Sequence, residues 1–106
     1  MRAFHTITIG GKDYKLRLTA SAIMSIEKKL GQSMFTALEN IENNLVETVV
    51  TMLWGSLQPL NANCSYDTAM ELFDQYIDDG NLVEDLINEL TTTMGTSGFL
   101  AKGQAV

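Results

Sequence analysis

Hydrophobic and polar residues alternate near the N-terminus in the way that predicts a β-hairpin. Threonine, lysine and arginine side chains fall on one face of the two expected strands. The other face is apolar on both sides of a Gly10-Gly11 pair, at Ile7, Ile9, Tyr14, Leu16 and Leu18. We expect this hairpin to cover residues 3–18.

The register of the hairpin has two alternatives. A two-residue turn at Gly10-Gly11 pairs Ile7 with Tyr14. A four-residue loop over residues 10–13 pairs Ile7 with Leu16 and places apolar residues opposite one another more often, so it is the favoured alternative. Both registers keep the same residues on the inner face, because they differ by an even number of residues.

Two strands alone are marginally stable in water, so helices or another subunit must cover the apolar face. We expect another subunit to supply part of this cover, so that the hairpin joins subunits of a homo-oligomer. The residues assigned to this self-association are Ile7, Ile9, Tyr14 and Leu16.

After Thr19 the hydrophobic period changes to three and four residues, which predicts helices. The expected helices cover about residues 20–30, 34–42, 45–57, 66–78 and 82–94. Polar residues that suit N-caps precede them, and some carry a glutamate three residues later. These N-terminal signals are Thr19, Ser33, Asn44 with Glu47, Ser65, and Asn81 with Glu84. Gly31 suits a left-handed residue after the first helix.

The expected helix over residues 45–57 is apolar around most of its circumference, which predicts a central, buried position. Trp54 is interpreted as a core residue of this helix. Several of its residues are β-branched, so a strand over residues 47–53 remains an alternative.

The chain has 106 residues, enough for one domain. We expect a single, mainly helical α+β domain over residues 1–94 and a flexible tail over residues 95–106, which contain three glycines. The formal charge of −6 argues against nucleic acid as a partner. Neither a signal peptide nor a membrane-spanning run is recognisable, so we expect a soluble, cytosolic protein.

No residue pattern indicates catalysis, a cofactor or a metal. His5 and Cys64 are the only histidine and cysteine, and no orienting motif accompanies either. They are too few for a zinc site. The carboxylates Asp67, Glu71, Asp74 and Asp78 share one helix face, which is interpreted as a solvated surface. We therefore expect a protein that is not an enzyme.

Two sequence motifs take the interpretation further. Residues 11–17 read Gly-Lys-Asp-Tyr-Lys-Leu-Arg, and residues 26–31 read Ile-Glu-Lys-Lys-Leu-Gly. This hairpin followed by a helix resembles the opening of the tail assembly chaperones of long-tailed phages and prophages of Gram-positive bacteria. The similarity covers about residues 5–90, and its motif-like part is the first third.

The resemblance implies a non-enzymatic assembly factor that coats the tape-measure protein in the cytoplasm of the bacterial host and is absent from the mature virion. It also implies a longer form of the chain, made by frameshifting, that recruits the tail-tube protein. The residues expected to bind the partner are Met70, Phe73, Ile77, Phe99 and Leu100. The alternatives are a virion structural protein, such as a neck or tail-completion subunit, and a small acidic regulatory protein that binds a host protein.

Overall fold

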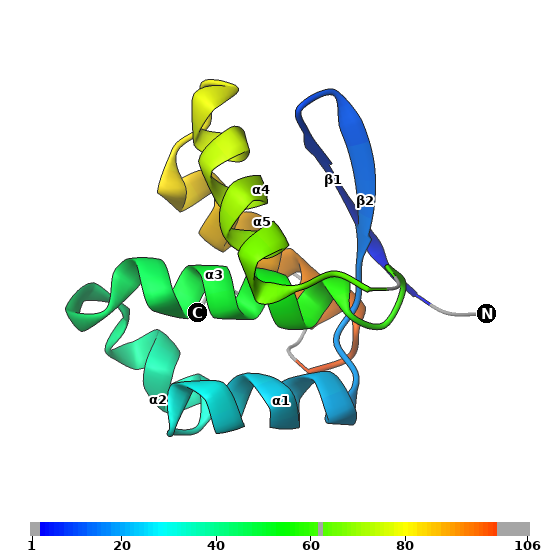
Figure 1. The fold of residues 1–106 in the computed structure, drawn as a ribbon. Helices are drawn as coiled ribbons and strands as arrows, with labels where there is room; N and C mark the ends of the chain where they lie inside the picture. Colours follow the sequence, from blue (N-terminus) through cyan, green and yellow to red (C-terminus); the bar gives the residue numbers. More distant parts are fainter. Residues whose placement is uncertain (1–2, 62, 100–106) are drawn as a thin grey trace.

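The computed structural model describes residues 3–61 and 63–99. Within them an N-terminal antiparallel hairpin precedes five α-helices, which confirms the expected α+β class (Figure 1). The strands are β1 (His5–Ile9) and β2 (Lys12–Leu16). The helices are α1 (Ala20–Leu30), α2 (Met34–Glu39), α3 (Leu45–Leu57), α4 (Tyr66–Asp78) and α5 (Val83–Thr96), with a 3-10 turn η1 (Ile41–Asn43) before α3.

The hairpin uses the two-residue turn, so the favoured four-residue loop is wrong. Ile7 pairs with Tyr14, and Ile9 pairs with Lys12. Gly10 and Gly11 both have positive φ values, 61° and 78°, as a two-residue turn that matches strand twist requires. The longer loop was favoured because it gives apolar cross-strand pairs. In the structure Ile9 is opposite Lys12, not an apolar residue, and is still buried at 2% exposure.

The chain's own helices cover the inner face of the hairpin. β1 packs against α4 and α5, and β2 packs against α3. Ile7 and Leu16 are consequently 1% and 0% exposed, and Tyr14 is half-buried. The cover that two strands require therefore comes from within the chain.

Helix α3 lies at the centre of the fold, as its composition predicts, and the alternative strand over residues 47–53 is wrong. Helix α3 packs against α1, α4, α5, β2 and η1, and Figure 1 shows this helix crossing the middle of the molecule. Leu53 and Val49 on this helix are completely buried. The surrounding elements supply the packing that offsets the weak helix propensity of its β-branched residues.

Three of the expected N-caps are present. The side chains of Thr19, Ser33 and Ser65 accept hydrogen bonds from backbone N–H groups in the first turns of α1, α2 and α4, each at 3.1 Å. Gly31 ends α1 in the left-handed conformation, with φ 72°. Local side-chain chemistry therefore sets these helix boundaries correctly.

Asn44 is the N-cap residue of α3 as expected, but its side chain does not cap the helix, and the expected N-cap at Asn81 is wrong because Leu82 holds that position. The Asn44 side-chain amide donates to the Glu47 carboxylate at 2.7 Å instead of accepting from the helix. Before α5, the Asp85 carboxylate accepts from the Leu82 N–H at 2.7 Å, while the Asn81 side chain donates to the Tyr76 carbonyl. Similarly, the helix expected over residues 34–42 ends at Glu39 and is followed by η1.

The C-terminal helix ends two residues later than the expected end at residue 94. α5 continues to Thr96, and Gly98 follows with φ 91°. The Phe99 N–H donates to the Met94 carbonyl at 2.9 Å, and the Gly98 N–H donates to the Gly95 carbonyl at 3.1 Å. These bonds form a Schellman motif. The rest of the predicted tail, residues 100–106, lies outside the described residues.

Candidate protein-interaction surface

His5 and Cys64 have separate partners. His5 Nε2 lies 3.0 Å from Glu89 Oε1 and links β1 to α5. The Cys64 thiol donates to the Ser65 carbonyl at 3.8 Å, and partial burial raises its pKa, which reduces the thiolate fraction. Within residues 3–61 and 63–99, no group of three or more His, Cys, Asp or Glu side chains is placed to hold a metal ion.

Helix length bears on membrane insertion. The longest helix in the described part of the chain is α5, with 14 residues. No described helix has the length and apolar character needed to cross a bilayer.

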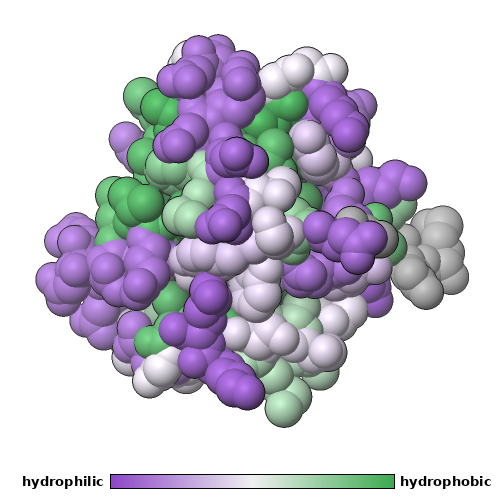
Figure 2. Space-filling view, viewed as in Figure 1, coloured by the Kyte–Doolittle hydropathy of each residue, from purple (hydrophilic) through white to green (hydrophobic). Residues whose placement is uncertain are grey.

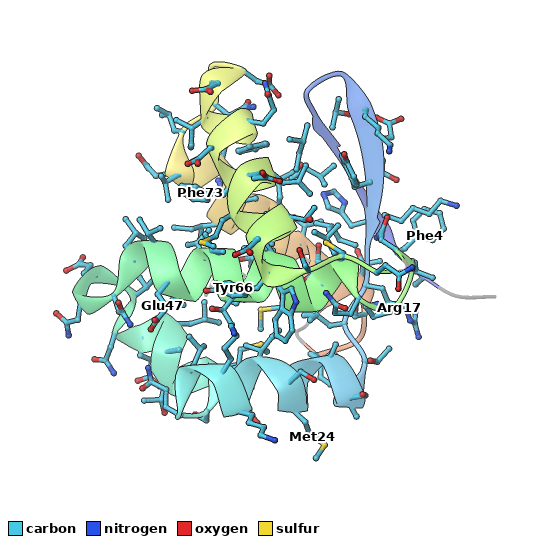
Figure 3. All side chains as sticks on the ribbon, in the orientation of Figure 1. Phe4, Arg17, Met24, Glu47, Tyr66 and Phe73 are labelled. Carbon is cyan, nitrogen blue, oxygen red and sulfur yellow. The ribbon has the colours of Figure 1, made fainter. Side chains whose placement is uncertain are left out.

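Three of the expected partner-binding residues lie together on one flank of α4. Met70, Phe73 and Ile77 are spaced three and four residues apart, so their side chains line one side of the helix. Met70 is 41% exposed, Ile77 is half-buried and Phe73 is 9% exposed. Figure 3 shows Phe73 on the side of α4 away from the hairpin. We call these three residues the α4 stripe.

Carboxylates border the α4 stripe on its solvent side. Asp67 and Asp74 lie three residues before and four residues after Met70, and Asp78 follows Ile77. All three are exposed, and we call them the acidic rim. In Figure 2 hydrophilic side chains run along the front of α4, with hydrophobic ones on its left flank. The described residues include no Lys or Arg paired with the acidic rim.

The opposite flank of α4 faces the hairpin across an open groove. Two adjoining hollows of about 330 and 380 Å³ share Lys12, Tyr14, Thr68 and Leu72 in their linings. Glu71 lines the first hollow. Lys12 Nζ lies 5.3 Å from the centre of the Tyr14 ring, a cation–π distance.

The hairpin tip is fixed to the C-terminal end of α4. The Gly10 N–H donates to Asp79 Oδ2 at 2.6 Å, and Gln75 Nε2 donates to Asp79 Oδ1 at 2.8 Å. These donors, the Gly10 amide first, lower the pKa of the Asp79 carboxyl. No local sequence signal indicates this contact, because Asp79 is distant from the turn along the chain.

Acid is expected to release the hairpin tip from α4. A carboxyl whose pKa is lowered on folding stabilises the fold above its unfolded pKa, and this contribution is lost as the pH falls through the folded pKa. In an NMR titration, the Gly10 amide shift should therefore report a transition below the ordinary aspartate range. Asp79→Asn should abolish that transition. A Gly10 amide that titrates with an ordinary aspartate pKa would contradict the contact.

A cation–aromatic cluster joins three helices. Lys29 Nζ of α1 lies 4.1 Å from the ring centre of Tyr66 and 5.5 Å from that of Trp54. The two rings pack edge to face at 5.9 Å, and the Tyr66 hydroxyl lies 2.9 Å from Thr51 Oγ1. Trp54 is therefore half-buried at the edge of the core, and no local pattern revealed its partners.

The remaining expected contact residues are placed differently. The self-association residues Ile7, Ile9 and Leu16 are buried under the chain's own helices, which removes the physical reason for a second subunit to cover them. Phe99 is 39% exposed at the end of α5, and Leu100 lies outside the described residues. Among residues 3–61 and 63–99, the exposed large apolar side chains outside the expected contact residues are Phe4, Met24, Phe35, Val46 and Leu82.

The described fold is that of a small α+β protein with several exposed apolar side chains on its surface. The chain belongs to a family of unknown function, DUF6096, whose model matches residues 1–105. No curated protein matches the chain. No solved structure matches it either.

Proposed function

We propose that this chain is a non-enzymatic phage tail assembly chaperone that binds the tape-measure protein and assists tail-tube assembly. The observation that carries the proposal is the α4 stripe, an apolar surface on a folded helix with Met70 at 41% exposure. The sequence resemblance of residues 11–31 to tail assembly chaperones supports the choice of partner.

The stripe is suited to holding another helix. Helices recognise apolar grooves and stripes through residues spaced three, four and seven apart, and the two residues of the stripe that reach solvent, Met70 and Ile77, are seven apart. Methionine is flexible and polarisable, so it adapts to partner surfaces of irregular shape. A chaperone that coats a long helical protein needs such tolerance, because successive segments of its client differ.

The proposal includes where the chain acts and with what. It works in the cytoplasm of the bacterial host and leaves before the virion is complete. A longer, frameshifted form recruits the tail-tube protein. Self-association takes place through surfaces other than the buried inner face of the hairpin.

Mass spectrometry separates this proposal from a role as a virion structural protein. Cells producing the phage should contain the chain together with assembling tails, whereas purified particles should lack it. A constant number of copies in each purified particle would refute the chaperone and indicate a neck or tail-completion subunit. The major tail-tube protein serves as the internal reference in both samples.

A further inference from the structure

We propose that the α4 stripe and the acidic rim together form the docking site for a basic amphipathic helix of the partner. Its apolar face packs on Met70 and Ile77, and its Lys or Arg side chains pair with the acidic rim. This inference rests on the proposed function for the identity of the partner, whereas the chemistry of the docked helix follows from the surface itself.

The apolar part of the site is accessible without unfolding. Met70 is 41% exposed and Ile77 is half-buried, while Phe73, 9% exposed, anchors the stripe to the core. A docked helix would therefore remove Met70 and Ile77 from water while the core stays intact. This burial is the source of affinity.

Charge decides which kind of helix fits. Asp67, Asp74 and Asp78 are exposed beside the stripe, and among residues 3–61 and 63–99 the one ion pair is His5 with Glu89. The whole chain has a formal charge of −6. An acidic partner helix would meet like charges along the rim, whereas a basic one meets complementary carboxylates.

The spacing of the rim specifies the spacing of the partner's charges. With a rise of 1.5 Å per residue, Asp67 and Asp74 are separated by about 10 Å along the helix axis, and Asp74 and Asp78 by about 6 Å. Basic residues seven and four positions apart on a helix packed alongside α4 reproduce these separations. The same spacing keeps them next to an apolar stripe.

Fluorescence anisotropy with model peptides tests the site. The probe is a labelled 18-residue helix of Leu, Ala and Lys, with Lys residues bordering a Leu face. One control peptide has Glu in place of Lys, and another has the same composition in an order that removes the apolar face. The folded chain should bind the probe at least tenfold more tightly than either control, and added salt should weaken binding.

Variants locate the binding site. Asp74→Lys/Asp78→Lys should weaken probe binding at least tenfold, because two attractive contacts become repulsive. Met70→Glu should do the same by placing a charge in the apolar stripe. Glu39→Lys reverses a charge at the exposed end of α2, and Met24→Glu places a charge on the exposed face of α1, so both variants should bind the probe nearly as the unaltered chain does.

The outcomes distinguish this inference from the proposed function. Equal binding of all three peptides, or equal losses in Glu39→Lys and in the double rim variant, would overturn the docking site. The rim residues are exposed, so the double variant should keep its fold, which circular dichroism checks. If the tape-measure protein binds and the probe does not, the site is wrong and the function stands. If the probe binds and the tape-measure protein does not, the docking site stands and the proposed function is wrong.

Discussion

Gly55→Val is expected to lower the free energy of unfolding by about 3 kcal/mol, the upper end of the range for overpacked cores. A Cβ at Gly55 would overlap Cγ1 and Cδ1 of Ile26, where α1 crosses α3. Ile26 is completely buried, so its side chain has no open space to move into. Gly55→Ala should cost less, because about 1 kcal/mol of gained helix propensity offsets the overlap.

Urea unfolding followed by circular dichroism measures both variants. Thr92 is an exposed position within α5, and the stability difference between Thr92→Gly and Thr92→Ala gives the propensity contribution alone. Ile26→Ala should partly relieve Gly55→Val, with a coupling free energy of about 0.5–3 kcal/mol. Strictly additive effects of the two substitutions would contradict the close approach of α1 and α3.

Leu53→Ala is expected to lower the free energy of unfolding by about 2–5 kcal/mol, as for other large-to-small core substitutions. Leu53 is 0% exposed on the helix that contacts most other elements. Truncation leaves a cavity that the surrounding helices cannot fill without moving.

Val46→Ala is the matched control, since Val46 lies seven residues earlier on the same side of α3 but is 54% exposed. Its effect should be within about 0.5 kcal/mol. Chemical unfolding of the two variants under identical conditions makes the comparison. Similar losses for Leu53→Ala and Val46→Ala would show that α3 is not packed as described.

Much of the fold could be predicted because its signals are local. Thr19, Ser33 and Ser65 cap helices in the structure through side chains that reach only three residues along the chain. The all-round apolar character of residues 45–57 likewise placed α3 at the centre. Hydrophobic periodicity and helix capping depend on residues only a few positions apart, so a single sequence is enough to identify them.

The errors arose where two local signals competed or the deciding partner was distant. At the hairpin, cross-strand apolar pairing was weighted above turn chemistry, yet the positive φ values of Gly10 and Gly11 determine the register. At the end of α5, three glycines indicated a tail, although Gly98 is the left-handed residue of a helix cap. The Asp79 contact with Gly10 joins residues that no short window contains.

The candidate surface was predictable only in part. Helical spacing placed Met70, Phe73 and Ile77 on one flank of α4, but only tertiary packing shows that Phe73 is buried while Met70 remains exposed. For the same reason the inner hairpin residues were expected at a subunit interface. Sequence periodicity identifies an apolar face without showing which element covers it.

Co-expression with the tape-measure protein encoded in the same phage or prophage tests the central claim most directly. Affinity-tagged chain should co-purify the tape-measure protein and keep it soluble, and Asp74→Lys/Asp78→Lys should retain much less of it than Glu39→Lys does. A tape-measure protein that stays insoluble, or fails to co-purify with the folded, unaltered chain, would contradict the account.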